Sequence, residues 1–382
     1  MMFDRRLIKQ FDWPLLGIAL LIPLLGLINL YSAGFERDAA YRIVPFLPVT
    51  VASQAFARQV LFLSLGLVVL CAAILVPTSF LQRYAWLFYG ACVALLIAVL
   101  VGGVVVNGSR RWLSLGGFNL QPAEPMKLAL ILALARYLSR NPPRRGGYTL
   151  PQLILPGLTL LVPMGLVMKQ PDLGSALSLG IIGGAMILFM GVNIRVLLAG
   201  LLVVAAGAWP AWHSLYPYQQ RRILTLFNPD ADPRGSGYHI IQSKIAVGSG
   251  ELFGKGYLQG TQTQLEFLPE HTTDFIFSVL GEEWGFLGCV FVLALYLYFI
   301  SRLLRVAARS KDLFGSMVTV GIAAVFFFHV LINVAMVIGL LPVVGIPLPL
   351  FSHGGSAVVS AMVGLGIVLG ISMRRFMYRG RT

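Results

Sequence analysis

Residues 60–76 read VLFLSLGLVVLCAAILV, an apolar run without a single charged side chain. An α-helix needs roughly 20 such residues to cross the hydrocarbon core of a bilayer. Comparable runs recur at residues 14–30, 86–106, 150–168, 173–190, 196–215, 275–300, 315–340 and 356–373. The sequence therefore predicts an all-α fold, a polytopic membrane helical bundle.

The overall composition supports the same class. Of the 382 residues, 57% are hydrophobic and only 12% are charged, which excludes a cytosolic enzyme and a disordered or repeat-array protein. The three cysteines, Cys71, Cys92 and Cys289, all lie inside apolar runs. They are expected to be small core residues, and a secreted disulfide scaffold is excluded.

A further segment, residues 122–138, is less apolar because it carries Glu124 and Lys127 near its start. The distribution of basic residues indicates that it also crosses, because the basic clusters then share one side of the membrane. These clusters are Arg5, Arg6, Lys9, Arg83, Arg140, Arg144, Arg145, Arg195, the group at 302–311 and the tail at 374–381. The positive-inside rule then predicts about ten transmembrane helices with both termini cytoplasmic. The net charge of +14 is thereby explained without a nucleic-acid partner.

One connection is far longer than the others. Residues 216–273 form a polar loop rich in glycine and proline, which the same topology places on the outer side. The amphipathic stretch 240–247 predicts short interfacial helices within this loop. The loop contains no Walker A or GxGxxG motif, and the five histidines show no metal-binding spacing. We expect a single integral membrane domain over residues 1–382.

Asp274 stands where the long outer loop enters an apolar helix. Aspartate is favoured as an N-cap, so capping is one interpretation. A carboxylate beside an outward-facing cleft is equally well placed to act as a general base. The two roles are compatible. Glu282 and Glu283 follow about two turns later, on other faces of the helix, and we expect them to form structural pairs inside the bundle.

Glu124 and Lys127 have i,i+3 spacing and therefore share one helix face. They predict a structural ion pair inside the bundle or, alternatively, the polar wall of a substrate cavity with Lys127 facing a phosphate. Asp172, at an outer hairpin, is expected to cap the following helix or to complete that polar network.

Four arginines break the positive-inside pattern because they lie on the outer side: Arg110, Arg111, Arg221 and Arg222. Arginine binds phosphate through paired hydrogen bonds, so these residues are candidate phosphate ligands. Contact with lipid headgroups is the competing interpretation. The uncharged outer hairpin 341–356 is expected to form a rigid turn, with an apolar groove beside it that suits a lipid chain.

Several motifs, in order along nearly the whole chain, resemble those of the SEDS family of bacterial shape, elongation, division and sporulation proteins. The motifs are Arg110-Arg111-Trp112, Gln121-Pro122-Ala123-Glu124-Pro125-Met126-Lys127, Lys169-Gln170-Pro171-Asp172-Leu173-Gly174, His271-Thr272-Thr273-Asp274-Phe275, Gly281-Glu282-Glu283 and Gly345-Ile346-Pro347-Leu348-Pro349. The last of these looks like the elongation branch of the family. His353 departs from the family pattern, which usually has tyrosine or serine at that position, and Ala123 stands where serine is common.

The resemblance implies a peptidoglycan glycosyltransferase that polymerises lipid II at the outer face of the bacterial plasma (inner) membrane during cell elongation and cell-shape maintenance. The family's essential aspartate corresponds to Asp274. The resemblance also implies a class B penicillin-binding protein and components of the elongation complex as partners. The pyrophosphate of the lipid needs positive charge, for which Arg110, Arg111, Lys127 and Arg221 are candidates. A divalent cation such as Mg²⁺ or Mn²⁺ is an alternative source of that charge.

Two other functions fit a polytopic protein of this kind. A lipid II flippase would also need polar intramembrane residues, but it should show a polar path across the whole membrane and often an inverted repeat. The polar residues here cluster on the outer side, and neither the segment around Glu124 nor that around Asp274 is repeated. A scaffold that only recruits enzymes would leave these buried charges without a purpose. The sequence favours a transferase.

Overall fold

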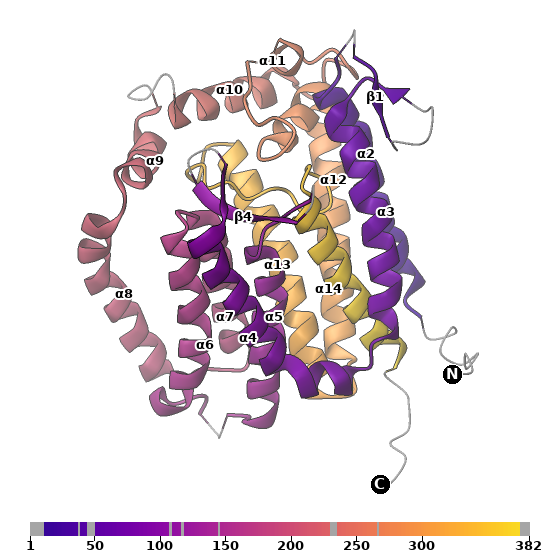
Figure 1. Cartoon of the computed structure of the whole chain (residues 1–382). Coiled ribbons are helices and arrows are strands. Elements are labelled where there is room, and N and C mark those ends of the chain that lie inside the picture. Colours follow the sequence, from indigo (N-terminus) through magenta and orange to yellow (C-terminus); the bar gives the residue numbers. More distant parts are fainter. Residues whose placement is uncertain are drawn as a thin grey trace.

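The computed structural model describes residues 11–374 except 37–38, 44–49, 107–108, 116–117, 144–145, 230–234 and 266. Each of the ten apolar segments expected from the sequence forms a helix, and most of these helices lie side by side in one bundle (Figure 1). They are α2 (Trp13–Ala33), α3 (Gln54–Leu75), α4 (Thr78–Gly102), α5 (Ala123–Arg140), α6 (Leu150–Lys169), α7 (Leu173–Phe189), α8 (Ile194–Ser214), α12 (Ile276–Ala308), α13 (Leu313–Val337) and α14 (Gly355–Met373). The predicted all-α membrane bundle is confirmed.

Seven of the described helices are long and apolar enough to cross a membrane, namely α2, α3, α4, α6, α12, α13 and α14. The helix α7 and residues 194–207 of α8 are also apolar but shorter. The helix α5 is the charged segment that carries Glu124 and Lys127. A count of ten crossings therefore stays a prediction for these three.

Both described chain ends lie at the same end of the bundle. At the start of α2, Asp12 Oδ1 lies 2.5 Å from Arg302 Nη2, close to the C-terminal end of α12. After α14, Arg374 donates hydrogen bonds to the carbonyls of Ile74 and Val76, where α3 ends. The start of α12, which follows Asp274, lies at the opposite end. The basic residues Arg5, Arg6, Lys9, Arg144, Arg145 and those after 374 lie outside the described residues.

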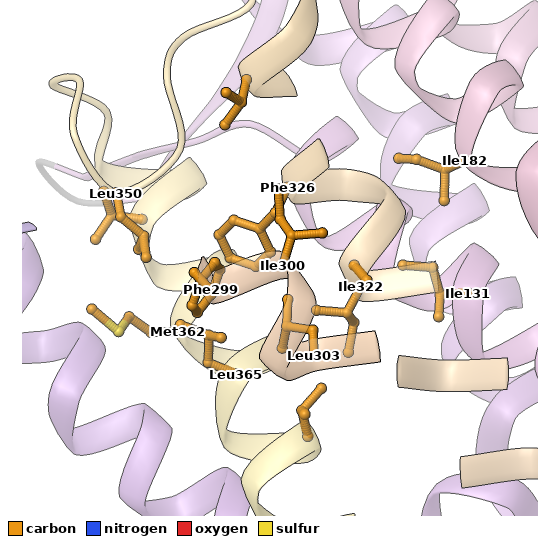
Figure 2. Packing of buried hydrophobic residues seen from close by; sticks show 14 of the residues in the cluster. Ile131, Ile182, Phe299, Ile300, Leu303, Ile322, Phe326, Leu350, Met362 and Leu365 are labelled. Atoms are coloured by element: carbon orange, nitrogen blue, oxygen red, sulfur yellow. The ribbon is translucent and has the colours of Figure 1, made fainter. Parts of the chain in front are cut away.

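The core is a continuous apolar cluster that joins α5, α7, α12, α13 and α14 (Figure 2). At its centre the rings of Phe299 and Phe326 meet edge to face, with centroids 4.9 Å apart. The small residues of α14 allow α3 to approach closely. A side chain at Gly366 would begin 2.5 Å from the carbonyl oxygen of Leu70, so the backbones touch there.

The long loop forms short helices, as its amphipathic stretches predict. They are α9 (Pro217–Phe227), α10 (Ser236–Ser249) and α11 (Thr261–Gln264), and they lie across one end of the bundle (Figure 1). The helix α8 stands apart from the bundle, and none of its described side chains is buried.

Two small sheets were not anticipated from the sequence. The strands β1 (Tyr41–Arg42) and β2 (Thr50–Val51) form a two-stranded pair. A second antiparallel sheet has the order β3 (Val104–Val106), β4 (Ser109–Leu115) and β5 (Phe118–Leu120). The helix expected over residues 86–106 therefore ends at Gly102, because Val104–Val106 pair with β4 instead.

The helix α12 is broken at Gly285, whose φ of 65° and ψ of −165° are not helical. The loop at residues 251–256 pairs with this break through the backbone. The amide of Lys255 donates to the carbonyl of Glu282 at 2.9 Å, and the amide of Phe286 donates to the carbonyl of Glu251 at 2.8 Å. Since a broken helix exposes backbone groups that lipid cannot satisfy, the loop replaces the missing helical hydrogen bonds.

Candidate active site

Asp274 lies in the turn that leads into α12, on the side of the bundle covered by the long loop. Its backbone carbonyl accepts a hydrogen bond of 2.8 Å from Nδ2 of Asn333 on α13. A Cβ atom placed on Gly345 would lie 3.5 Å from Asp274 Oδ2, so the hairpin 341–356 lies directly against the carboxylate. The side chain is partly exposed and makes no hydrogen bond or ion pair with the described residues.

The surroundings of Asp274 favour its protonated form. Burial by the turn and the hairpin, followed by the negative charge of Glu270, raises the pKa of the Asp274 carboxyl to about 7. The positive charges of Arg222 and Arg111 oppose this shift, while Asp172 adds to it. A carboxylate with a pKa near neutral pH accepts a proton readily and can release it again, which is what a general base requires.

The interpretation of Asp274 as a helix cap is not supported. The N-cap residue of α12 is Phe275, and no side-chain cap hydrogen bond is formed there. The turn is held instead by backbone hydrogen bonds, including that from the amide of Phe275 to the carbonyl of Glu270 at 3.2 Å. The carboxylate is therefore not used to hold the helix in place.

Asp172, by contrast, does cap its helix. Its Oδ1 accepts a hydrogen bond of 3.1 Å from the amide of Ser175 at the start of α7. The same carboxylate accepts a hydrogen bond of 3.2 Å from Gln121 Nε2 and lies 3.7 Å from Nη1 of Arg111 on β4. Arg111 also donates to the carbonyl of Pro171. Asp172 thus links β4 to α7. One interpretation expected it to complete the polar network of Glu124 and Lys127, but its contacts are with Arg111, Gln121 and Ser175 instead.

The outer arginines differ in their relation to Asp274. Arg111 and Arg222 lie close enough for their charges to act on its carboxyl. Arg110 and Arg221, which the sequence placed among the phosphate ligands, are exposed and are absent from the charges that act on Asp274. The sequence identified Arg221 and Arg222 only as a pair, because which of the two faces Asp274 depends on how α9 packs against the bundle.

Glu124 and Lys127 form the expected ion pair. Lys127 Nζ lies 2.8 Å from Glu124 Oε1, and both side chains are buried. They stand at the polar end of a pocket of about 630 Å³, including its open mouth, between α5, α13, α14 and the hairpin. His329 and His353 also line this pocket, and each has one ring nitrogen, Nε2 and Nδ1 respectively, without a hydrogen-bond partner among the described residues.

The predicted apolar groove beside the outer hairpin corresponds to the rest of this pocket. Its walls include Pro347 and Leu350 of the hairpin together with Ile322 of α13 and Ala361 of α14. The pocket is tied to the turn that holds Asp274, because the amide of His353 donates to the carbonyl of Thr272 at 3.0 Å. The pocket is thus lined mainly by apolar side chains and adjoins the turn that holds Asp274.

Asn333 is a site residue that the sequence analysis missed. Its Nδ2 donates to the carbonyls of Asp274, at 2.8 Å, and of Ile346, at 2.9 Å. One amide thus holds the turn and the hairpin against each other. A buried amide in the middle of an apolar helix is itself a functional signal, and this signal was available at position 333.

Glu282 and Glu283 form structural contacts, as expected from their position on α12. The buried Glu282 carboxylate lies 2.7 Å from Lys255 Nζ and accepts hydrogen bonds from the loop at residues 261–263. Glu283 accepts a hydrogen bond of 2.5 Å from Ser32 on α2. The two glutamates therefore fix the long loop and α2 to the helix that follows Asp274.

A metal site built from protein ligands is not found in the described part of the chain. No group of three or more histidine, cysteine, aspartate or glutamate side chains there stands close enough to hold an ion. The positively charged groups that act on Asp274 are the arginines Arg222 and Arg111.

A family model described as cell cycle protein, which covers FtsW, RodA and SpoVE, matches residues 12–376. Among curated proteins, peptidoglycan glycosyltransferase MrdB of Escherichia coli K12 is 42% identical over 325 residues, covering 84% of this chain and 86% of that protein. Peptidoglycan glycosyltransferase RodA of Treponema pallidum is 30% identical over 442 residues, covering 96% and 99%.

Solved structures show the same fold. One belongs to work on the structural coordination of polymerization and crosslinking by a peptidoglycan synthase complex. A chain of it matches with a TM-score of 0.79 and 33% identity, covering 96% of this chain and 99% of that one. The crystal structure of the Rod shape determining protein RodA of Thermus thermophilus matches with a TM-score of 0.70 and 32% identity, covering 96% and 98%.

Proposed function

The chain belongs to the cell cycle protein family of FtsW, RodA and SpoVE and is a peptidoglycan glycosyltransferase, and we propose that it polymerises lipid II with Asp274 as its general base. The observation that carries this assignment is a partly exposed carboxylate that makes no hydrogen bond or ion pair with the described residues and whose pKa is raised to about 7. Such a group is ionised in a useful fraction at neutral pH and still takes up a proton.

In the proposed reaction, Asp274 accepts the proton of the acceptor sugar 4-hydroxyl as that oxygen attacks C1 of the donor sugar. The bond from C1 to the undecaprenyl pyrophosphate breaks, and the configuration at C1 inverts. Pyrophosphate leaves as an anion and needs no proton, so a single carboxylate suffices. Glycosidases use two carboxylates because their leaving group must be protonated. Asp172 is engaged with Arg111 and Ser175 and is not needed as a second one.

The leaving group brings negative charge that the protein must compensate. Arg111 and Arg222 are the arginines whose charges already reach Asp274, and we assign them to the pyrophosphate in preference to Arg110 and Arg221. The pocket that contains Lys127 is suited to the prenyl chain and phosphate of a second lipid substrate, because its remaining walls are apolar. Lys127 and Glu124 are then substrate-facing residues as well as an ion pair.

The protein is a multi-pass membrane protein. We infer that its described ends face the cytoplasm and that Asp274 faces outward, because the basic residues Arg83, Arg140 and Arg302 lie at the end of the bundle away from Asp274. We also infer a role in cell elongation and cell shape, together with the elongation complex, since one relative is named a Rod shape determining protein.

A transpeptidase must cross-link the strands. We propose a class B penicillin-binding protein as this partner, because a related chain occurs in a peptidoglycan synthase complex that couples polymerization and crosslinking.

The test is polymerisation of fluorescent lipid II by the purified protein, with and without a class B penicillin-binding protein. We expect glycan ladders from the wild type and none from Asp274→Asn, which keeps the size of the side chain but cannot accept the proton. The control is Glu251→Gln, an exposed carboxylate of the same outer loop, which should polymerise normally. Ladders from Asp274→Asn would reject the general base. Absence of ladders from the wild type under all these conditions would reject the transferase in favour of lipid II transport.

A further inference from the structure

A pocket lined by basic and aromatic residues lies at the end of the bundle opposite Asp274. It is formed by Trp86 of α4, by Arg136, Tyr137, Arg140 and Asn141 at the end of α5, and by Leu155 of α6. Its volume is about 760 Å³, including the part open to the outside. None of these residues takes part in the reaction proposed above, so the pocket needs a separate explanation.

The three helices that form this pocket bring positive charge to it and no nearby carboxylate. The helices α4 and α6 contain no aspartate or glutamate, and the single acidic residue of α5 is Glu124. Glu124 stands twelve residues before Arg136, about 18 Å away along the helix at 1.5 Å per residue. Arg136 Nη1 donates a hydrogen bond of 2.6 Å to the backbone carbonyl of Arg83, three residues before Trp86. Among the described residues, Arg136 and Arg140 therefore bring positive charge to this pocket, and none of the three helices that form it contributes a carboxylate there.

The two arginines that line the pocket differ in burial and in hydrogen bonding. Arg136 is half-buried and is held in place by its hydrogen bond to the Arg83 carbonyl, which uses one of its five N–H donors. Arg140 is exposed and forms no hydrogen bond or ion pair with the described residues. A fixed guanidinium beside one that is available is an arrangement suited to a phosphate group, which accepts several hydrogen bonds at once.

The other residues of the pocket indicate that the phosphate belongs to a lipid. Trp86 and Tyr137 are residues of the kind that gather at the boundary between the hydrocarbon and the headgroups. Leu155 is 46% exposed on the outer surface of α6, where an acyl chain would run. The Tyr137 hydroxyl already donates to the carbonyl of Gln152 at 2.9 Å, so its ring is held in position.

We propose that Trp86, Arg136, Tyr137 and Arg140 form a binding site for the headgroup phosphate of an anionic phospholipid, in the leaflet opposite the catalytic side. Basic pockets between transmembrane helices bind such headgroups, and each arginine near an anionic surface contributes a few-fold in affinity. A zwitterionic lipid offers the same phosphate but brings its own cation into a pocket that already has an excess of positive charge.

The experiment measures lipid binding to the delipidated full chain by native mass spectrometry. The probes are dioleoyl phosphatidylglycerol and dioleoyl phosphatidylcholine, which share their acyl chains. We expect phosphatidylglycerol to bind the wild type at least about fivefold more tightly than phosphatidylcholine. Arg140→Gln should weaken the binding of phosphatidylglycerol by about fivefold. The double variant Arg136→Gln/Arg140→Gln should weaken it by about 25-fold, if each arginine contributes independently.

Arg195→Gln is the matched control, since Arg195 is an exposed arginine at the start of α8 and does not line the pocket. It should bind phosphatidylglycerol as the wild type does. Arg140→Gln alone keeps the test valid if the double variant fails to fold, because the Arg140 side chain is exposed and makes no hydrogen bond or ion pair with the described residues. Equal binding of both lipids, unchanged binding by Arg140→Gln, or an equal loss in Arg195→Gln would overturn the proposal. Displacement of the lipid by millimolar inorganic phosphate would assign the site to free phosphate and would overturn it as well.

Discussion

The carboxylate of Glu282 on α12 and the ammonium of Lys255 in the long loop lie 2.7 Å apart, and Glu282 follows Asp274 by eight residues in the sequence. Glu282 is fully buried and also accepts hydrogen bonds from the backbone amide of Gln262 at 2.9 Å and from the hydroxyl of Thr263 at 3.2 Å. This side chain therefore helps to fasten the loop that covers the catalytic side, together with the backbone hydrogen bonds between residues 251–256 and α12. Whether the loop stays in place depends chiefly on Glu282 and less on Lys255.

The first prediction follows from this difference. Glu282→Ala removes the acceptor of several buried donors and should lower the free energy of unfolding by on the order of 3 kcal/mol. Lys255→Met leaves the carboxylate bonded to the loop and removes a partly exposed ammonium, so the loss should be about 1 kcal/mol. Hydrogen exchange over residues 255–264 measures the local effect. Equal exchange in the two variants would contradict the larger role of Glu282 in holding the loop.

A second prediction concerns the pH dependence of polymerisation. A general base acts only when it is ionised, and the pKa of Asp274 is raised to about 7. The kcat/KM for lipid II should therefore rise about tenfold per pH unit below pH 7 and level off above it. A flat profile between pH 5.5 and 8.5 would remove Asp274 from the proton transfer, provided that a substrate titration over the same range is also flat.

A third prediction is that Asp274 costs stability at neutral and alkaline pH. Because the folded-state pKa is higher than the ordinary value of 3.8, the folded protein binds the proton more tightly than the unfolded chain. The resulting stability is fully present below pH 3.8 and is lost as the pH rises through about 7. Asp274→Asn cannot ionise, so its Tm should exceed that of the wild type at pH 8.5.

The difference in Tm should shrink as the pH falls to 5.5, where the wild-type carboxyl is mostly protonated. Thermal unfolding in one detergent at both pH values makes the comparison. A variant that is less stable than the wild type at pH 8.5 would mean that the ionised carboxylate is held by contacts that the structure does not contain.

Adjacent arginines provide a fourth prediction. Arg222 acts on the charge of Asp274 and lowers its pKa, whereas Arg221 does not. Removing a nearby cation makes ionisation harder, so Arg222→Gln should move the rising limb of the pH profile to higher pH. Arg221→Gln is the control and should leave the limb where it is. The same displacement in both variants would indicate a general surface-charge effect and not a specific contact with the site.

The sequence predicted the helices well because crossing a membrane imposes a length and a composition that can be read directly. Asp274 and Glu124 could also be identified, since a charge near an apolar segment is costly and therefore conspicuous. The pairing of Glu124 with Lys127 followed from i,i+3 spacing within one helix. Local periodicity determines each of these features.

The missed features all depend on contacts between distant parts of the chain. The strand β4 contains Arg110 and Arg111, and its pairing with β3 and β5 has no strong signal in a chain dominated by apolar helices. Asn333 was overlooked because its role appears only when the turn at Asp274 and the hairpin at Ile346 come together. The sequence likewise did not distinguish Arg222 from Arg221, because nothing local determines how α9 faces the site.

The last prediction separates the two interpretations of Glu124 and Lys127. Either single variant, Glu124→Gln or Lys127→Met, leaves one buried charge without its partner and should lower the free energy of unfolding by about 3–5 kcal/mol. The double variant removes both charges together and should recover most of that stability. Denaturation measures stability, and polymerisation of lipid II measures activity. A purely structural pair would regain activity together with stability. Because the pair stands at the polar end of the apolar pocket, we expect the double variant to be stable and still at least about tenfold less active, since losing one charged contact to a phosphate has an effect of that size.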